Sequence, residues 1–333
     1  MKNLPSLFES KHLNPRPLES RIPFCKLIEK KTNKIFFFMV ATFLMTFFSA
    51  FPCSGAKLPV AASIFPVADI VKQVGGEHVE VITIVPPGAS PHTFELKPGI
   101  VKKISSARIF FMIGAGLEYW NEKFVNSTGG RLKKVVLSDG VDLIHEKEHH
   151  HGEKTGKHHS GDMFANPHIW LDVEIVKSMV KKVVTALASV DNGHALYYEE
   201  RGNKYIAELD RLDQTIYKET GKFKIKRYVA FHPAWDYFAR RYGLESAGVI
   251  ESVPGKSPTP LDIKNIVGNI KKHGVKAVFA EPQFNPKIAE VIAKEAGVKV
   301  LMLDPMGGPG IKGRENYIDI MKYNLAVFQE AML

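Results

Sequence analysis

The sequence predicts an α/β fold of two lobes, each a mainly parallel sheet flanked by helices, joined by one long rigid backbone helix. Short apolar runs alternate with helical patterns, this alternation occurs twice, and one long helical pattern separates the two series. The length of 333 residues and the apolar content of 45% fit two ordinary globular domains. This composition excludes a disordered, collagen-like or coiled-coil chain.

The first series of elements lies in the first lobe, which we expect to span residues 57–190. Short apolar or β-branched runs predict four strands, at residues 59–65, 79–85, 108–113 and 134–137. Helical spacing predicts one helix over residues 67–74, which ends at a Gly-Gly pair, and another from about Val173.

The second series lies in the second lobe, which we expect to span residues 223–333. Strands are predicted at residues 227–231, 276–280 and 298–303, and helices at residues 234–242, 260–274, 286–296 and 316–332. The start of one helix is well marked, because Thr259 suits the N-cap, Pro260 the first position and Asp262 the first turn.

A long helix is predicted between the lobes, from His194 to Lys222 within a linking segment of residues 191–222. Apolar and aromatic residues recur on one helical face, at Tyr198, Tyr205, Ile206, Leu209, Leu212 and Ile216. A helix of about 28 residues is ~42 Å long. This length favours a stiff strut over an ordinary domain helix.

The N-terminus predicts a secretory signal. Residues 35–52 form the only long apolar run, three lysines precede it, and Ser54-Gly55-Ala56 offers a cleavage site. We expect residues 1–56 to be removed, which leaves a mature start at Lys57. An uncleaved anchor, or lipid attachment at Cys53, stays open as an alternative. Each alternative places the folded part outside the cytoplasmic membrane, in the periplasm.

Cysteine and charge content exclude several classes of protein. Both cysteines, Cys25 and Cys53, lie before residue 57, so a disulfide scaffold or a cysteine-ligated zinc finger is excluded from the mature part. Half of the formal charge of +10 lies in the first 56 residues. No basic stripe with interleaved aromatics follows, so we expect no nucleic-acid partner.

Polar side chains follow several predicted strands, where ligands bind in parallel α/β sheets. His92 lies in the loop after residues 79–85, and His232, Glu281 and Asp304 each directly follow a strand. His168 precedes the helix from Val173. Imidazoles with a carboxylate suit zinc. A histidine at a strand end is also commonly a hydrogen-bonded structural residue, so both interpretations stay open at this point.

Two tryptophans adjoin these histidines in the sequence. Trp170 and Trp235 are expected either to wall the site or to be plain core aromatics. His78, His194 and His273 lie among polar neighbours near element boundaries, so we expect them to be surface residues.

A His-rich segment spans residues 145–159 and has no large apolar residue, so we expect a surface loop. Its histidines predict an auxiliary, low-affinity metal site, at His145, His149, His150, His151, His158 and His159. The string from His145 to His149 formally matches HExxH, but a zincin motif needs a stable amphipathic helix that this tract does not offer.

The mature chain resembles the metal-binding cluster (A-I) of periplasmic solute-binding proteins of ABC transporters, specifically the zinc-uptake branch. The similarity spans about residues 59–333 and is carried by the sequence segments 62–76, 85–98, 166–172, 230–244, 279–284 and 303–307. It implies a fold of two α/β lobes joined by one backbone helix, with the metal between the lobes.

The resemblance also implies a ligand set and a function. The metal ligands fall on His92, His168, His232 and Asp304, with Glu281 or water as the rival fourth ligand. Manganese-type relatives usually have glutamate at the third position, so His232 favours zinc, as does the His-rich segment. The implied function is a high-affinity zinc receptor, not an enzyme, that delivers Zn²⁺ to an ABC permease in the cytoplasmic membrane. We expect it to be a monomer.

Two other functions stay open at this stage. One is a manganese-binding receptor or adhesin of the same family. The other is a secreted zinc-dependent hydrolase, which needs an open coordination position and a general base, for which Glu281 is the candidate.

Overall fold

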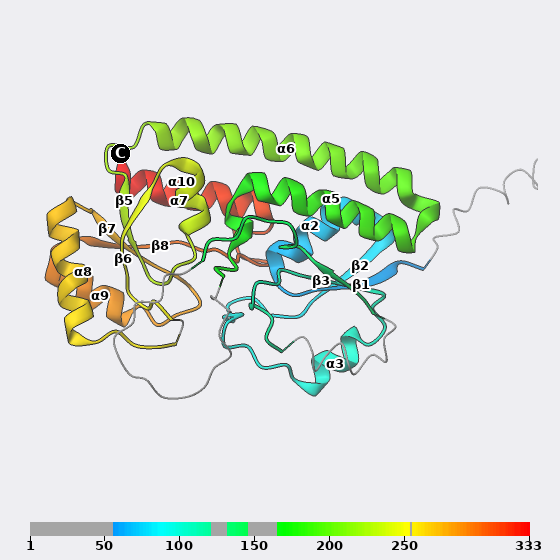
Figure 1. Ribbon diagram of the computed structural model, residues 1–333, viewed down its shortest axis with the longest axis horizontal. Coiled ribbons are helices and arrows are strands. Elements are labelled where there is room, and N and C mark those ends of the chain that lie inside the picture. The colour runs from blue at the N-terminus through cyan, green and yellow to red at the C-terminus, as the bar shows by residue number, and fades with distance from the viewer. Residues whose placement is uncertain (1–55, 121–131, 146–164, 254) are drawn as a thin grey trace, which may run out of the picture. The chain divides into compact units, whose positions relative to one another are not determined.

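Two four-stranded parallel sheets form the framework of the protein (Figure 1). The computed structural model describes residues 56–120, 132–145, 165–253 and 255–333. The strand order is β2-β1-β3-β4 in the first sheet and β6-β5-β7-β8 in the second, and every pairing is parallel. The strands are β1 (Leu58–Ala62), β2 (Val79–Thr83), β3 (Ile109–Met112), β4 (Lys133–Val136), β5 (Arg227–Ala230), β6 (Glu245–Val249), β7 (Ala277–Ala280) and β8 (Lys299–Met302).

Helices pack against both sheets and against one another. They are α2 (Phe65–Gly75), α3 (Pro98–Ile104), α5 (Val173–Val190), α6 (Ala195–Gly221), α7 (Asp236–Tyr242), α8 (Pro260–His273), α9 (Lys287–Ala296) and α10 (Tyr317–Met332). The central strands β3 and β7 are buried along their whole length, which is why they read as continuous apolar runs. The predicted start of α8 is confirmed, because Thr259 and Asp262 form a capping box.

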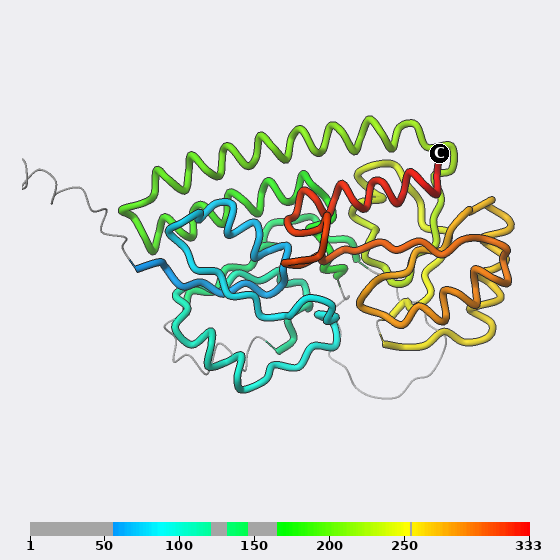
Figure 2. The backbone as a smooth tube through the Cα atoms, turned by 180° about the vertical axis from the view of Figure 1, so that it is seen from behind, coloured from blue at the N-terminus to red at the C-terminus, as the bar shows by residue number. Residues whose placement is uncertain are grey.

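The predicted long helix is α6, which has 27 residues and runs alongside both lobes (Figure 1). Its buried side chains include five of the six that mark the predicted face, and Ile206 is partly buried. Helix α10 packs against α6 and α2 and contacts β8 (Figure 2). The predicted architecture of two parallel-sheet lobes with a long helix between them is therefore confirmed.

One strand and one α-helix of the described fold were not predicted from the sequence. Strand β6 lies at a sheet edge, contains Gly248, and pairs with β5 through a register shift between Tyr228 and Val229. Helix α3 has seven residues, and of these only Ile104 is buried. Both lack a continuous apolar pattern because each buries few of its side chains.

Several sequence predictions concern residues outside the described ranges. These are the signal segment up to residue 55 and the auxiliary histidines other than His145. Within the ranges given above, no helix is both long and apolar enough to span a membrane. The lobe boundaries drawn from the sequence stay a prediction.

Candidate metal centre

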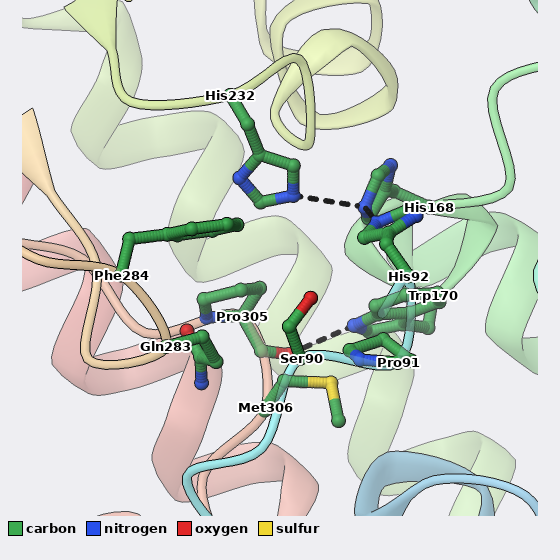
Figure 3. A pocket seen from close by; sticks show the side chains of 10 residues that line it. All are labelled: Ser90, Pro91, His92, His168, Trp170, His232, Gln283, Phe284, Pro305 and Met306. Carbon is green, nitrogen blue, oxygen red and sulfur yellow. Dashed lines mark hydrogen bonds between the residues drawn. The ribbon is translucent and has the colours of Figure 1, made fainter. Parts of the chain in front are cut away.

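Three histidines from distant parts of the chain meet at one point (Figure 3). His92 lies in the proline-rich loop after β2, His168 immediately precedes the short 3₁₀ turn Ile169–Leu171, and His232 follows β5. Each offers a ring nitrogen, and these nitrogens lie within 4.8 Å of one another. The structure therefore brings these three histidines of the predicted site together.

The spacing of the nitrogens suits one small cation. The Nε2 atom of His168 lies 3.0 Å from Nε2 of His92 and 3.1 Å from Nε2 of His232. Two nitrogens bound tetrahedrally to one zinc, each ~2.0–2.1 Å from the metal, would lie about 3.4 Å apart. The two measured separations are therefore within about 0.4 Å of the spacing that a common zinc ion requires.

Hydrogen bonds behind two of the rings fix which nitrogen carries a proton. Nδ1 of His168 lies 2.8 Å from Oδ1 of Asn166. The amide nitrogen of Asn166 donates to Pro233 O and Asp236 Oδ2, which fixes the orientation of the amide. Nδ1 of His232 lies 2.8 Å from Oε1 of Glu281. Since both partner oxygens accept, both Nδ1 atoms donate, and in the neutral form of each ring the Nε2 atom carries the lone pair. Either a proton or a metal ion between these two Nε2 atoms joins the rings.

Burial disfavours protonation of the His92 and His168 rings. Burial, followed by the effect of nearby His232, lowers the pKa of His92 to about 3. Burial also holds the pKa of His168 well below its ordinary value, with smaller contributions from His232 and His92. Both rings therefore remain neutral at pH 7, which is the form that binds metal ions.

The cavity beside the rings has room for an ion and little more. Its volume is about 10 Å³, which is roughly the space that one water molecule requires. Apolar side chains form much of its wall, among them Trp170, Phe284 and Met306 (Figure 3). The ring of Phe284 lies 5.0 Å from that of His232, measured between centroids. Such a wall limits access of water to the imidazoles.

Segment 166–170 ties the two lobes together at the site. Asn166 donates to Pro233 O at 2.6 Å, and Trp170 Nε1 donates to Pro305 O at 2.8 Å. The hydroxyl of Tyr237 in turn donates to Asn166 O at 2.8 Å. His168 is therefore held against the second lobe by hydrogen bonds from residues on both sides of it in the sequence.

The two tryptophans have different environments. Trp170 lines the cavity, as one of the two interpretations expected. Trp235 is a core aromatic, with its ring 5.4 Å from that of Phe328.

The two candidate acidic ligands lie elsewhere. Glu281 is behind His232, on the Nδ1 side, and is 1% exposed. The Asp304 carboxylate binds Arg314 Nη1 at 2.9 Å and accepts the backbone N–H groups of Met306 and Gly307. Neither belongs to the group of converging ligand atoms found in the described part of the chain.

The remaining predicted histidines are separate from this centre. His145 is exposed and forms an isolated bridge with Ala165, whereas His149, His150, His151, His158 and His159 lie outside the described ranges. His194 is exposed, and it stacks on half-buried His78 with ring centroids 3.8 Å apart.

Three residues of the site were missed as orienting groups. Asn166 stands two residues before His168, so its proximity in sequence was a usable signal. Glu281 follows β7, which neighbours β5 in the sheet, so both strand ends share one edge. Arg314 had no usable signal, because the loop that carries it has no regular pattern.

The chain matches a known protein family over most of its length. A family model described as "Zinc-uptake complex component A periplasmic" (ZnuA) matches residues 60–331. The high-affinity zinc uptake system protein ZnuA of Bacillus subtilis (strain 168) is 28% identical over 283 residues, which cover 84% of this chain and 89% of that protein.

Two further comparisons bear on the fold and the metal. A crystal structure of ZnuA has a TM-score of 0.75 and 29% sequence identity, and the match covers 84% of this chain and 100% of that one. The manganese ABC transporter substrate-binding lipoprotein PsaA of Streptococcus mitis is 28% identical over 290 residues, covering 84% of this chain and 90% of that protein.

Proposed function

Because the chain belongs to the family of zinc-uptake complex component A, we propose that it is a zinc-binding receptor that delivers Zn²⁺ to an ABC importer. His92, His168 and His232 bind the ion through their Nε2 atoms. The receptor works in the periplasm, its partner is a permease in the cytoplasmic membrane, and it acts as a monomer.

One observation carries the proposal. The Nδ1 atoms of His168 and His232 are hydrogen-bonded to Asn166 and Glu281, so the Nε2 atoms of the two rings, which carry the lone pairs when the rings are neutral, face each other across 3.1 Å. A bound cation removes the repulsion between these lone pairs and joins the two rings to His92.

The donor set favours zinc over manganese. Three imidazole nitrogens suit zinc, whereas manganese prefers carboxylate, carbonyl and water oxygens. The carboxylate of Glu281 is bound to His232, and that of Asp304 is bound to Arg314. A manganese receptor, like the relative from Streptococcus mitis, is therefore the less favoured alternative.

The site is suited to hold an ion rather than to catalyse a reaction. A hydrolase requires room for a substrate and a base beside the metal-bound water. The cavity of about 10 Å³ offers no such room, and Glu281 contacts the rear of His232. We therefore assign no enzymatic activity to the centre.

Calorimetric titration of the metal-free protein with zinc tests the proposal. His232→Ala removes one of three donors and should weaken binding at this site more than about 100-fold, since even the loss of a supporting residue costs 10–100-fold. His194→Ala is the matched control, because His194 is exposed and distant from the centre in sequence and contacts. Its affinity should equal that of the unaltered protein. Unchanged affinity in His232→Ala would refute the assignment.

The His-rich segment requires a separate measurement. We propose that it captures zinc weakly, so deletion of residues 146–159 should remove low-affinity binding and leave the tight site intact. Loss of the tight site in that variant would instead place ligands in the segment.

A further inference from the structure

The Asp304 carboxylate is held by a closed set of partners beside the metal centre. Oδ2 accepts from Arg314 Nη1 at 2.9 Å, and Oδ1 accepts from the backbone N–H groups of Met306 and Gly307 at 3.0 and 2.9 Å. Gln283 Nε2 lies 3.4 Å from the same Oδ1. Both carboxylate oxygens therefore have hydrogen-bond partners other than the histidines.

This carboxylate is nevertheless a close neighbour of the cavity. Pro305 and Met306, the next two residues, line it together with Gln283 (Figure 3). Asp304 itself is 1% exposed, so its carboxylate is shielded from bulk water. A metal ion bound by the histidines would be the strongest competing partner for its negative charge.

Arg314 is built into a compact loop that holds its guanidinium in place. The guanidinium lies 4.5 Å from the centroid of the Tyr323 ring, in a cation–π contact. The carbonyl of Arg314 accepts from Gly308 N at 3.1 Å. Gly307 has a φ of 59°, and a Cβ there would lie 2.7 Å from that same carbonyl oxygen, so this close approach requires glycine.

We propose that Arg314 is a positioning residue that withholds Asp304 from the metal and thereby sets selectivity for zinc over manganese. This inference rests on the proposed function, because it concerns the ion bound by the same three histidines. Asp304 and Arg314 neutralise each other, which leaves imidazole nitrogens as the protein's donors.

Removal of the Arg314 guanidinium should reduce the selectivity of the site for zinc over manganese. A buried carboxylate without its cation is left with an uncompensated charge, which a divalent ion at the neighbouring centre can neutralise. An added oxygen donor benefits manganese more than zinc, because manganese is the harder ion. Selectivity should therefore fall without loss of the site.

The test compares zinc and manganese affinities in competition with a chelator for four proteins. These are the unaltered chain, Arg314→Met, Asp304→Asn and the Arg314→Met/Asp304→Asn double variant. Arg314→Met should lower the zinc-to-manganese affinity ratio at least about tenfold, and the double variant should restore it. Asp304→Asn should weaken zinc binding less than His232→Ala does, because it removes no imidazole donor, although it leaves Arg314 without its anion.

A spectroscopic measurement accompanies these affinities. The absorption bands of bound Co²⁺ should change in Arg314→Met and return to their original form in the double variant, since only the former adds a carboxylate to the metal. If Arg314 had only a structural role, the Co²⁺ bands would not change in Arg314→Met and then return in the double variant.

Two results would overturn the inference. One is an unchanged affinity ratio in an Arg314→Met protein with a native thermal transition. The other is a zinc affinity in Asp304→Asn that falls as far as in His232→Ala, and this result does not depend on whether Arg314→Met folds. Failure of the proposed function would look different, because the unaltered chain would then bind zinc no better than the His232→Ala variant.

Discussion

At the metal centre, two histidines have a hydrogen-bond acceptor at Nδ1, and this contact determines whether Nε2 is available to bind a metal ion. Asn166 and Glu281 accept from the Nδ1 atoms of His168 and His232. These bonds fix the tautomer and the ring orientation, and the carboxylate makes the opposite nitrogen more basic. We therefore expect the affinity of the proposed centre to depend also on the residues hydrogen-bonded to these Nδ1 atoms.

Glu281→Gln tests this dependence. The amide keeps the shape of the side chain but loses the charge that supports His232, so zinc affinity should fall about 10–100-fold in a chelator competition. Glu290→Gln changes an exposed glutamate of α9 and serves as the control. Equal affinities in the two variants would show that the contact with His232 is of no consequence.

Protonation of the site predicts how the metal-free protein responds to acid. The folded-state pKa of His92 is about 3, below the ordinary value of ~6.5 that applies to the unfolded chain. Below pH ~6.5 the unfolded chain therefore binds a proton that the folded protein does not, and the free energy of unfolding falls as the pH decreases. Above that pH His92 is unprotonated in both states, so stability no longer changes with pH through this histidine.

Denaturant unfolding of the metal-free protein between pH 6.5 and 5 measures the effect. The contribution of His92 should approach about 1.4 kcal/mol per pH unit. His92→Asn should reduce the slope by that amount. An identical slope in the variant would mean that His92 titrates normally in the folded state.

At the site, the sequence predicted the histidines but not the arrangement of the acids. Parallel strands end at a common edge, so His232 and Glu281 could be placed near each other from the strand pattern alone. The orientation of a carboxylate side chain, however, depends on its hydrogen-bond partners. Asp304 turns to Arg314, ten residues later in an irregular loop, and no sequence spacing reports that contact.

Among the elements, α6 is fixed to the first lobe by close packing against α5. Gly202 is buried on α6, and a Cβ at this position would lie 2.4 Å from Cγ2 of Val184. A glycine in a helix normally costs about 1 kcal/mol relative to alanine. Here it permits the two helices to approach closely, and that contact outweighs the helical preference.

A pair of glycine variants separates these effects. Gly202→Ala should lower the free energy of unfolding by about 1–3 kcal/mol, because the added methyl overpacks the interface. Gly268→Ala lies on α8 with no atom within 4 Å of the added Cβ, so it should raise stability by roughly 0.5–1 kcal/mol. Stabilisation by both would mean that α5 and α6 are not in tight contact.

Elements were predictable from sequence where they are strongly buried. The interior of β3 and β7 is a continuous apolar run, and α6 has a long apolar face. Strand β6 has the burial pattern of an edge strand and includes Gly248, so neither its composition nor its period marks it. Its place is determined by pairing with β5, which is a tertiary interaction.

Over the whole described fold, the two lobes share structure beyond the metal. Helix α6 runs alongside both, α10 joins β8 to α2 and α6, and segment 166–170 bonds to the second lobe (Figures 1 and 2). These links favour local adjustment of the site over wide opening of the lobes when zinc is released.

Shared structure predicts a single cooperative unfolding transition. Circular dichroism and tryptophan fluorescence should report the same midpoint during thermal unfolding. Zinc at 100 times its dissociation constant should stabilise the entire transition by about 2.7 kcal/mol. Two transitions, of which zinc moves only one, would show that the lobes fold independently.

The most direct test of the central claim is a zinc-edge X-ray absorption spectrum of the protein loaded with less than one equivalent of Zn²⁺. The account predicts three imidazole nitrogens at ~2.0–2.1 Å from the metal, with no carboxylate required. A shell with two imidazoles or fewer, or one dominated by oxygen donors, would contradict it.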